Sequence, residues 1–452
     1  MNLLDRYFNV SGAGSTVQRE MLGGATTFAT MSYIIFVQPT VLAMAGMDFG
    51  SVLLATCIAS AVGCFLMGLL ANYPFALAPG MGQNFLFSFT ICLGMGFSWQ
   101  AGLAIVLFSG IIFTILSLLG FREKMLDVFP AALKNAVGPA IGLFIAFIGL
   151  QWSGIVVLDP ATMTTLGDLT HPAPLTALFG LFVMAVLFAR GIHGGILIGI
   201  LITTGIGLLL GVIPFQTLTF EYSTETFFSL NFSELAARWQ DALLAIALFF
   251  FLDLFDTVGT LVGVGTQAGY MTEDGKLPRA GRAFLADALS TCTGALCGTS
   301  TVTTYIESAS GVAAGARTGL AAVTTGVCFL AAIALAPVVA LVGTNVGADY
   351  YAALGIEGSF VAMYPAVAPA LIVVGMLMLA PLRKVDWADA TESLPAFLTL
   401  TMMAFGYGIT EGIAFGCISF ALIKPAAGRG RDVHPIMYGV ALAFLLRYAF
   451  LV

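Results

Sequence analysis

The chain has 452 residues, of which 59% are hydrophobic and 9% are charged, and its mean hydropathy is +1.00. Because soluble domains carry roughly 25% charged residues, this composition excludes a soluble protein and indicates a polytopic α-helical membrane protein that sits in the lipid bilayer. The net charge of −7 comes without a basic patch, which excludes nucleic acid as a partner.

The residue types that bind metals are scattered. Seven cysteines and three histidines occur without a CxxC motif, whereas metal sites need closely spaced ligands. We therefore expect no metal and no cofactor, and we interpret the cysteines as small packing residues. Residues 1–21 lack the apolar core of a signal peptide, so we predict a cytoplasmic N-terminal segment that is not cleaved.

Apolar runs long enough to cross a bilayer follow one another along the chain. In chain order the predicted spans are 22–46, 50–71, 75–92, 99–120, 130–151, 173–189, 194–213, 240–264, 283–297, 302–316, 318–342, 359–381, 394–409 and 411–424. An apolar tail follows at 435–452, where a surface helix on the cytoplasmic face is one interpretation.

The distribution of basic residues supports fourteen spans with both termini in the cytoplasm. With this count, Arg238 is the one basic residue among seventeen that falls on the outer side, while Arg447 in the tail stays undecided. A miscounted span would exchange the sides of every later loop, against the tendency of Lys and Arg to stay cytoplasmic. We therefore expect a multi-pass protein of the cell membrane.

Two sequence matches share one spacing. The stretch 136-AVGPAI-141 is similar to 366-AVAPAL-371, and 24-GATTFATM-31 is similar to 254-LFDTVGTL-261, both at an offset of 230 residues. The offset relates span 1 to span 8 and span 5 to span 12. Because seven is an odd number of crossings, the second copy enters from the opposite face, which is the inverted repeat of many secondary transporters.

Spans 3 and 10 carry signals of broken helices. In 73-YPFALAPGMGQNFLFSF-89, two prolines and two glycines predict an extended segment at 74–81 and a helix that resumes near Gly82. In 299-TSTVTTY-305, β-branched residues favour a strand, and a helix should start around Tyr305 or Ile306. Backbone groups at membrane depth need partners, so we predict that the two extended segments pair, with both following helix N-termini directed into one central space. Ordinary proline and glycine kinks are the alternative.

Acidic residues lie within these spans. Asp256 is in the middle of span 8 and Glu307 is at the predicted helix start in span 10, without a Lys or Arg at similar depth. Charged groups in the membrane are costly, so we expect ligand or proton sites. Asp253 is one turn from Asp256, where a proton relay and a bond to a neighbouring helix are both open. We expect Asp287 to be an interfacial charge and Glu411 to be a solvated helix cap.

Other side chains are candidates for a substrate site. Asn84 offers the donor and acceptor that suit a heterocycle edge, although a helix-packing amide is the alternative. Two threonines of span 1, Thr26 and Thr27, correspond by the repeat to Asp256 and Thr257. The aromatic side chains could enclose a flat ring or simply pack; they are Phe85, Tyr305 and Phe255.

Four stretches then resemble AzgA-like purine permeases of the xanthine/uracil permease superfamily. They are 23-GGATTFATMSYIIFVQPTVLAMAGMD-48, 77-LAPGMGQNFLF-87, 253-DLFDTVGTLVGVGTQAG-269 and 299-TSTVTTYIESASGVAAGARTG-319. The resemblance implies an all-α fold of seven plus seven spans, possible homodimers through a gate domain, and a base held by the acids at Asp256 and Glu307, with Asn84 at the polar position of span 3. It divides the chain into a core at 22–120 and 240–342, a gate at 130–213 and 359–424, and a C-terminal tail at 425–452.

These features predict a proton-coupled importer of guanine, hypoxanthine or adenine that works by alternating access. The site would comprise Asp256, Glu307, Asn84, Tyr305, Phe85 and Thr27, and the candidates for carrying the proton are Asp256, Glu307 and Asp253. A same-fold transporter of another polar solute, such as uracil, xanthine or an inorganic anion, is the alternative. A membrane enzyme is disfavoured, because the acids are not accompanied by a nucleophile–base set or a cluster of metal ligands.

Overall fold

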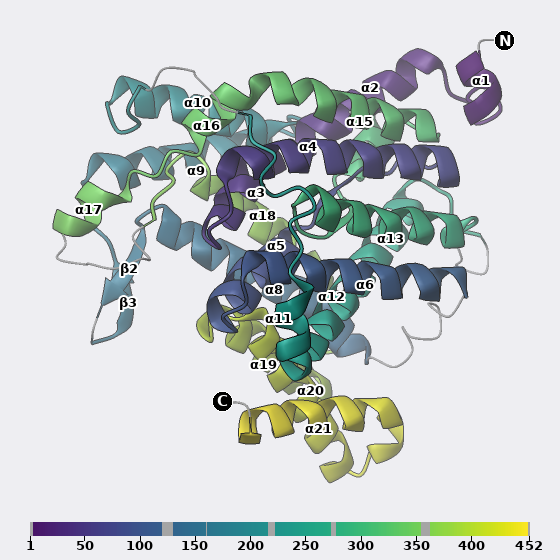
Figure 1. Cartoon of the computed structure of the whole chain (residues 1–452), viewed down its shortest axis with the longest axis vertical. Helices are drawn as coiled ribbons and strands as arrows, with labels where there is room; N and C mark the ends of the chain where they lie inside the picture. Colours follow the sequence, from purple (N-terminus) through teal and green to yellow (C-terminus); the bar gives the residue numbers. More distant parts are fainter. Residues whose placement is uncertain are drawn as a thin grey trace. The chain divides into compact units, whose positions relative to one another are not determined.

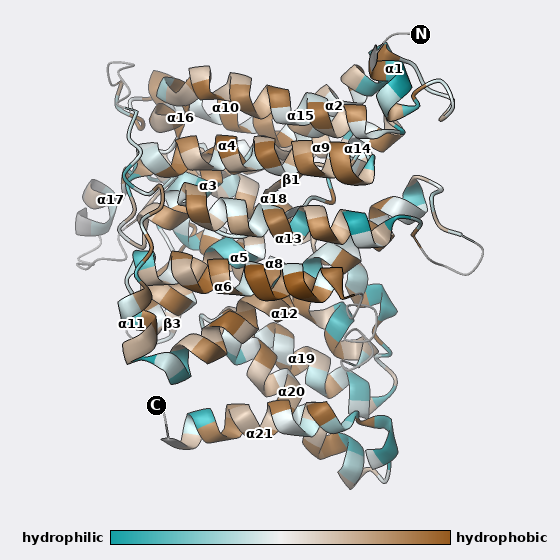
Figure 2. Ribbon diagram, turned by 45° about the vertical axis from the view of Figure 1, so that its right-hand side comes forward, coloured by the Kyte–Doolittle hydropathy of each residue, from teal (hydrophilic) through white to brown (hydrophobic). Residues whose placement is uncertain are grey.

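A computed structural model describes residues 3–119, 130–159, 161–215, 222–272, 277–353 and 362–450. These residues are mostly helical (Figure 1), and most of the helices consist largely of hydrophobic residues, coloured brown in Figure 2. Three basic residues used in the topology prediction, Arg122, Lys124 and Lys276, lie outside the described ranges, as does the start of the predicted span at 359–381.

The N-terminal half contains mainly long helices with one broken span. Its elements are α1 Leu3–Phe8, α2 Val17–Met31, α3 Ile34–Ala43, α4 Phe49–Leu66, the π-helical turn η1 Met67–Ala71, β1 Leu77–Pro79, α5 Met81–Phe85, the π-helical η2 Leu86–Gly94, α6 Trp99–Leu118, α8 Ala131–Trp152, the hairpin β2 Val156–Asp159 and β3 Met163–Leu166, α9 Pro172–Ala189 and α10 Gly195–Leu209.

The C-terminal half has a similar composition of helices. Its elements are α11 Phe232–Ala237, α12 Trp239–Gln267, α13 Ala280–Cys297, β4 Val302–Thr304, α14 Ser308–Ala313, α15 Gly319–Ala332, η3 Ile333–Leu335, α16 Ala336–Val342, α17 Gly347–Ala353, α18 Ala368–Leu377, η4 Ala380–Lys384, α19 Ala390–Phe405, α20 Ile409–Ala426, η5 Gly430–Asp432 and α21 Pro435–Phe450. Among the described residues, eight helical segments are long and apolar enough to cross a membrane.

The chain divides into two compact units. The first, unit 1, comprises Met1–Leu119 and Gly149–Ala370, and the second, unit 2, comprises Gly120–Ile148 and Leu371–Val452. Helices α8 and α18 each pass from one unit into the other. The core and gate boundaries drawn from the sequence stay a prediction.

In unit 1, α15 packs against both α2 and α4, α4 packs against α13, and α13 packs against α6 (Figure 1). Small residues allow the close approach of these elements. A Cβ atom added to Gly319 would lie 2.2 Å from the carbonyl oxygen of Gly68, a separation that no real side chain tolerates. Such small-residue contacts are how helices pack closely in membranes, where lipid is as apolar as the side chains.

The two broken spans meet through a short antiparallel sheet in unit 1. Strand β1 pairs with β4, and Ala78 lies opposite Thr303. The pairing continues beyond the strands, because the Gly80 N–H donates to the Thr301 carbonyl at 2.9 Å and the Tyr305 N–H donates to the Ala76 carbonyl at 2.9 Å. The sequence predicted this pairing. Helix α5 begins at Met81, near the predicted Gly82.

Helix α14 begins at Ser308, two to three residues later than the sequence predicted. The Tyr305 amide is held by its bond to Ala76, so this residue still belongs to the strand pairing. The Ser308 hydroxyl in turn accepts the Ala76 N–H at 2.9 Å. The first turn of α14 is thereby fixed to the segment that leads into β1.

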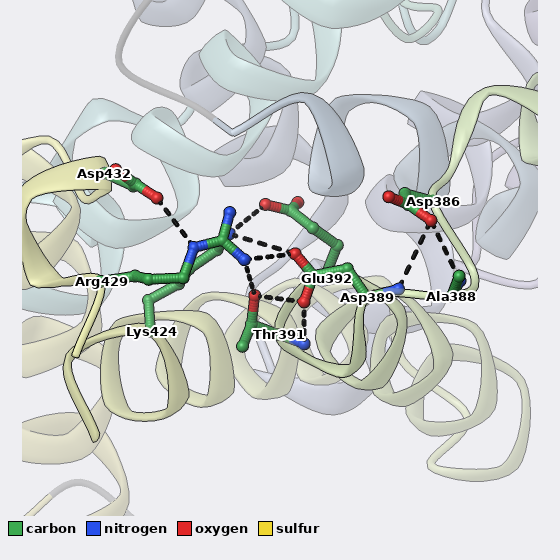
Figure 3. Close-up of polar contacts among 8 residues, drawn as sticks. All are labelled: Asp386, Ala388, Asp389, Thr391, Glu392, Lys424, Arg429 and Asp432. Carbon is green, nitrogen blue, oxygen red and sulfur yellow. Dashed lines mark hydrogen bonds and ion pairs between the residues drawn. The ribbon is translucent and has the colours of Figure 1, made fainter. Parts of the chain in front are cut away.

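Unit 2 contains an ion-pair cluster at the adjoining ends of α19 and α20 (Figure 3). The Lys424 ammonium, 1% exposed, lies 2.5 Å from a Glu392 carboxylate oxygen and 3.9 Å from Asp389. The Arg429 guanidinium lies 2.5 Å from Asp389 and 3.1 Å from Asp432. Hydrogen bonds from Thr391, together with the Arg429 guanidinium, hold the pKa of the Asp389 carboxyl well below its usual range.

Helix α21 runs antiparallel to α20 in unit 2. At one end, Tyr438 of α21 donates to the Gly430 carbonyl in the connection between the two helices. At the other end, Arg447 in the last turn of α21 lies 2.9 Å from Glu411 in the first turn of α20, and Tyr448 donates to the same carboxylate. Glu411 is therefore an ion-pair partner, which corrects the sequence-based interpretation of a solvated cap.

Candidate functional site

The two acids singled out from the sequence come together in unit 1. Asp256 lies in the middle of α12, and Glu307 directly precedes α14. They lie close enough to interact electrostatically, and both side chains keep part of their surface exposed. In the described part of the chain neither acid forms an ion pair with a lysine or arginine. Two acids without cationic partners are available to a ligand or a proton.

Each acid has one neutral hydrogen-bond donor from another broken span. The Gln83 amide of α5 donates to Asp256 Oδ2 at 3.2 Å. The Tyr33 hydroxyl, from the break between α2 and α3, donates to Glu307 Oε1 at 2.7 Å. Both donor residues are 1% exposed. The remaining oxygen of each carboxylate accepts no hydrogen bond from another described residue and is free to receive a donor from a ligand.

A third acid, Asp287 of α13, anchors β4 next to this site. It is fully buried, which corrects the expectation of an interfacial charge. Its carboxylate accepts hydrogen bonds from the Thr304 N–H and hydroxyl, both at 2.9 Å, from Thr303 at 3.3 Å and from Thr257 at 2.7 Å. The bonds join α12, α13 and β4, and so fix the strand that leads to Glu307.

Asp253 is buried one turn before Asp256, at 1% exposure, and accepts a hydrogen bond from the Thr291 hydroxyl of α13 at 3.2 Å. Thr291 also lies 3.1 Å from the Val302 carbonyl of β4. Of the two interpretations that the sequence left open for Asp253, the hydrogen bond to a neighbouring helix is therefore present. The role of Asp253 in carrying a proton stays a prediction.

Asn84 belongs to a separate buried polar group. Its Oδ1 accepts a hydrogen bond of 2.6 Å from the Ser300 hydroxyl, which in turn accepts one of 2.9 Å from the Gln38 amide. The Asn84 side-chain nitrogen has no partner among the described residues. Gln83, its neighbour along the chain, is therefore the amide that contacts an acid of the site, and the predicted role of Asn84 in binding substrate stays a prediction.

The predicted aromatic residues are engaged in packing and in bracing the sheet. The Tyr305 hydroxyl donates to the carbonyl of Pro79 in β1. The Phe85 ring is fully buried and stacks on Phe89 with centroids 5.8 Å apart. Phe255 stacks on Phe251 at 6.4 Å. Their predicted contact with a flat ring stays a prediction.

The threonines of span 1 lie where α2 meets α14. Thr27 is buried, and a Cβ atom added to Gly311 of α14 would lie 2.1 Å from its hydroxyl oxygen. Thr26 donates to the Leu22 carbonyl within its own helix at 2.8 Å. Thr27 therefore contacts α14, the helix that follows Glu307.

Sequence reasoning missed three members of this arrangement: Gln83, Tyr33 and Asp287. Gln83 stands beside the residue that was chosen, Tyr33 sits in an apolar run, and Asp287 was assigned to the interface. Helical spans interrupted near their centres, with polar groups gathered at the breaks, define the secondary-transporter class of membrane protein.

Comparisons with known proteins place the chain within this class. Residues 18–415 match the Permease family model Xan_ur_permease. The chain is 44% identical to the guanine/hypoxanthine permease PbuG of Bacillus subtilis, with 98% of this chain and 99% of that protein covered. It is 40% identical to the adenine permease AdeP of Escherichia coli, with 99% and 96% covered. The chain therefore belongs to the xanthine/uracil permease family.

A solved structure supports the fold. The transmembrane domain of the cyanobacterial bicarbonate transporter BicA aligns with a TM-score of 0.61 at 11% identity, covering 88% of this chain and 97% of that domain. Both comparisons agree with the sequence-based fold class, an all-α membrane protein of the seven-plus-seven type. The chain is a multi-pass membrane permease and not an enzyme, as the sequence predicted; the number and limits of its spans stay a prediction.

Proposed function

We propose that this permease imports purine nucleobases, with guanine, hypoxanthine and adenine as its candidate substrates. The observation that carries the proposal is the pair of partly exposed acids, Asp256 and Glu307, each with one oxygen bound by a neutral donor and one oxygen left over. The two relatives, a guanine/hypoxanthine permease and an adenine permease, support the same substrate class.

The chemistry of the site suits a neutral base that carries N–H donors. In this proposal Glu307 accepts the N1–H of hypoxanthine or guanine through a charge-assisted hydrogen bond, the stronger class of such bonds. The Gln83 amide, already bonded to Asp256, offers both a donor and an acceptor to the base. An inorganic anion, the substrate class of the structurally similar bicarbonate transporter, would be repelled by two acids without a cationic partner.

We further propose that transport is coupled to protons, with Asp256 as the proton carrier and Glu307 as the group that binds the base. Buried carboxyl groups in membranes commonly serve as proton relays. Replacing each acid by its amide separates the two roles. Asp256→Asn should retain binding and lose uphill accumulation, whereas Glu307→Gln should lose binding. The reverse pattern would exchange the two assignments, and accumulation that persists in both variants would contradict coupling through either acid.

Alternating access is the mechanism we propose, because inverted repeats with midplane sites support two related arrangements around one site. In this mechanism the predicted core segments would move relative to the predicted gate segments, so that the site opens to one side of the membrane at a time. Homodimerisation, implied by the resemblance, stays a prediction.

For the orientation, we propose that the N-terminal segment and the connection between α20 and α21 are cytoplasmic, which the arginines at Arg429 and Arg431 support. Helix α21 returns along α20, with Arg447 beside Glu411. This packing supports a C-terminal end of α21 on the outer face of the membrane, opposite to the cytoplasmic connection. The sequence had predicted a cytoplasmic C-terminus instead.

Cysteine labelling tests this orientation. In a background without native cysteines, Ala427→Cys reports on the connection and Ala449→Cys on the end of α21; both positions are exposed. A membrane-impermeant maleimide added to intact cells should label only the second. Labelling of both positions only after permeabilisation would contradict the proposed course of α21.

Uptake of radiolabelled hypoxanthine into proteoliposomes tests the proposed function. We expect saturable uptake that an inward proton gradient drives above equilibrium and that excess guanine or adenine reduces. Uptake of uracil or bicarbonate instead of any purine would contradict the substrate class. Uptake of a purine without a response to the gradient would contradict only the coupling.

A further inference from the structure

The break in the first span carries a side chain that acts on the candidate site. Helix α2 ends at Met31 and α3 begins at Ile34, so that Ser32 and Tyr33 separate the two. Tyr33 lies at the N-terminus of α3, where its carbonyl accepts the Val37 N–H at 3.0 Å. The side chain is 1% exposed. The backbone of α3 and dense packing therefore hold the Tyr33 ring in place.

Among the residues that the structure describes, the Tyr33 hydroxyl donates to Glu307 Oε1 alone, at 2.7 Å. This distance is typical of a strong charge-assisted bond from a hydroxyl to a carboxylate. A buried hydroxyl that loses its acceptor is left unsatisfied, which is unfavourable. The bond therefore persists unless another acceptor takes its place, and one oxygen of Glu307 is already in use when a substrate arrives.

The number of free oxygens matters for the choice between purines. The Watson–Crick edge of hypoxanthine offers one N–H at N1, whereas guanine offers two adjacent donors, at N1 and at the exocyclic amine. A carboxylate with two free oxygens accepts two parallel donors at once, which strengthens such a pair over a single bond. The second donor of guanine must then share Oε1 with the Tyr33 hydroxyl. A carboxylate oxygen can accept two hydrogen bonds, but each is weaker than a bond to an oxygen that accepts only one.

We propose that Tyr33 is a specificity-determining residue of this permease, which limits Glu307 to one strong, unshared hydrogen bond with the substrate and so reduces the advantage of guanine over hypoxanthine. The inference rests on the proposed function, because it assumes that Glu307 receives the purine edge. Tyr33 lies in the first span, and the sequence alone indicated no role for it.

The test compares Kd values of hypoxanthine and guanine for the purified protein and for Tyr33→Phe, which keeps the ring and removes the hydroxyl. In the variant both oxygens of Glu307 are free, so guanine should gain about ten-fold in affinity relative to hypoxanthine, the effect of one additional charge-assisted bond. Tyr351→Phe is the matched control. The Tyr351 side chain is buried, and its hydroxyl donates to the Gln151 carbonyl at 3.1 Å and not to the acid, so the ratio of the two Kd values should stay within about two-fold of the wild type.

Three results would overturn the inference. An unchanged ratio in Tyr33→Phe, or an equal loss of affinity for both bases, would make Tyr33 a supporting residue without influence on selectivity. A wild-type protein that binds guanine about ten-fold more tightly than hypoxanthine would contradict the inference without any variant, so the test does not depend on the folding of Tyr33→Phe. Absence of binding of any purine to the wild type would overturn the proposed function and the inference together, which distinguishes the two failures.

Discussion

The anchoring of β4 by Asp287 leads to a quantitative prediction. In Asp287→Ala the Thr304 N–H and the hydroxyls of Thr257, Thr303 and Thr304 lose a buried acceptor. The hydroxyls can rotate toward other acceptors, but the amide is fixed by the strand. A buried donor left unsatisfied costs about 1–3 kcal/mol, so loss of the amide bond and at least one hydroxyl bond should lower the unfolding free energy by about 2–4 kcal/mol.

Asp287→Asn retains one acceptor oxygen and should lose only about 1–2 kcal/mol. The matched control is Asp168→Ala. Asp168 also accepts hydrogen bonds from a threonine, Thr170, but it lies in an exposed loop, so the change there should stay below about 1 kcal/mol. Because β4 leads directly to Glu307, the Asp287 variants should also bind purines more weakly.

The assay is thermal unfolding in detergent, followed by tryptophan fluorescence, together with a purine-binding measurement on each variant. The order of unfolding midpoints should be wild type, then Asp168→Ala close below it, then Asp287→Asn, then Asp287→Ala. An Asp287→Ala midpoint equal to that of the control would refute the reasoning that this carboxylate holds the sheet.

Three further predictions concern packing and charge. Gly311→Ala places a methyl group where α14 and α2 touch and should destabilise the protein by about 1–3 kcal/mol. Gly259→Ala in α12, with no described residue within 4 Å of the added Cβ, should keep the melting temperature or raise it slightly, because alanine favours a helix interior over glycine. Lys424→Met removes the ammonium from a pair with Glu392, whose side chain is 21% exposed, and should cost about 1–3 kcal/mol, less than for a fully buried pair. A double variant with Glu392→Gln should recover part of this loss, and additive effects in the double-mutant cycle would exclude a coupled pair. Because the folded-state pKa of Asp389 lies below its ordinary value, its contribution is present above about pH 4 and is lost as pH falls through the lowered pKa. Asp389→Asn should therefore flatten the acid side of a plot of melting temperature against pH, and an unchanged slope would argue against this interaction.

The broken spans could be predicted from the sequence because their signals are local. Proline and glycine around Pro79 exclude a continuous helix, and the β-branched residues before Tyr305 favour a strand. Since extended backbone at membrane depth must find hydrogen bonds, the pairing of β1 with β4 followed from the same reasoning. The acids Asp256 and Glu307 stand out for an equally local reason, because a carboxylate in an apolar run is costly.

The remaining site residues depend on geometry that a local pattern does not contain. Whether Gln83 or Asn84 contacts Asp256 is decided by the phase of α5, and a shift of one residue turns a helix by about 100°. Asp287 was assigned to the interface because its predicted span began at 283, but α13 begins at Ala280. Its hydrogen-bond donors come from α12 and β4, and no sequence window includes all three elements.

Tyr33 and the course of α21 illustrate the same limit. The break between α2 and α3 contains no proline or glycine, since its residues are Ser32 and Tyr33, so a helical pattern continues through it. The pairing of Glu411 with Arg447 joins residues that the sequence placed in an outer turn and in an unassigned tail. The contacts of Tyr33 with Glu307 and of Arg447 with Glu411 each join segments that are far apart in the sequence. A local sequence pattern therefore cannot predict them.

The measurement that tests the central claim most directly is ligand-induced thermal stabilisation of the purified permease by adenine, guanine, hypoxanthine, xanthine and uracil, repeated for Glu307→Gln. Glu225→Gln, a substitution at an exposed acid in a connecting segment, serves as the control. The account predicts stabilisation of the wild type and the control by one or two purines, and no stabilisation of Glu307→Gln. Absence of stabilisation by any of the five bases, or an equal stabilisation of Glu307→Gln, would contradict the claim that this acid binds a purine.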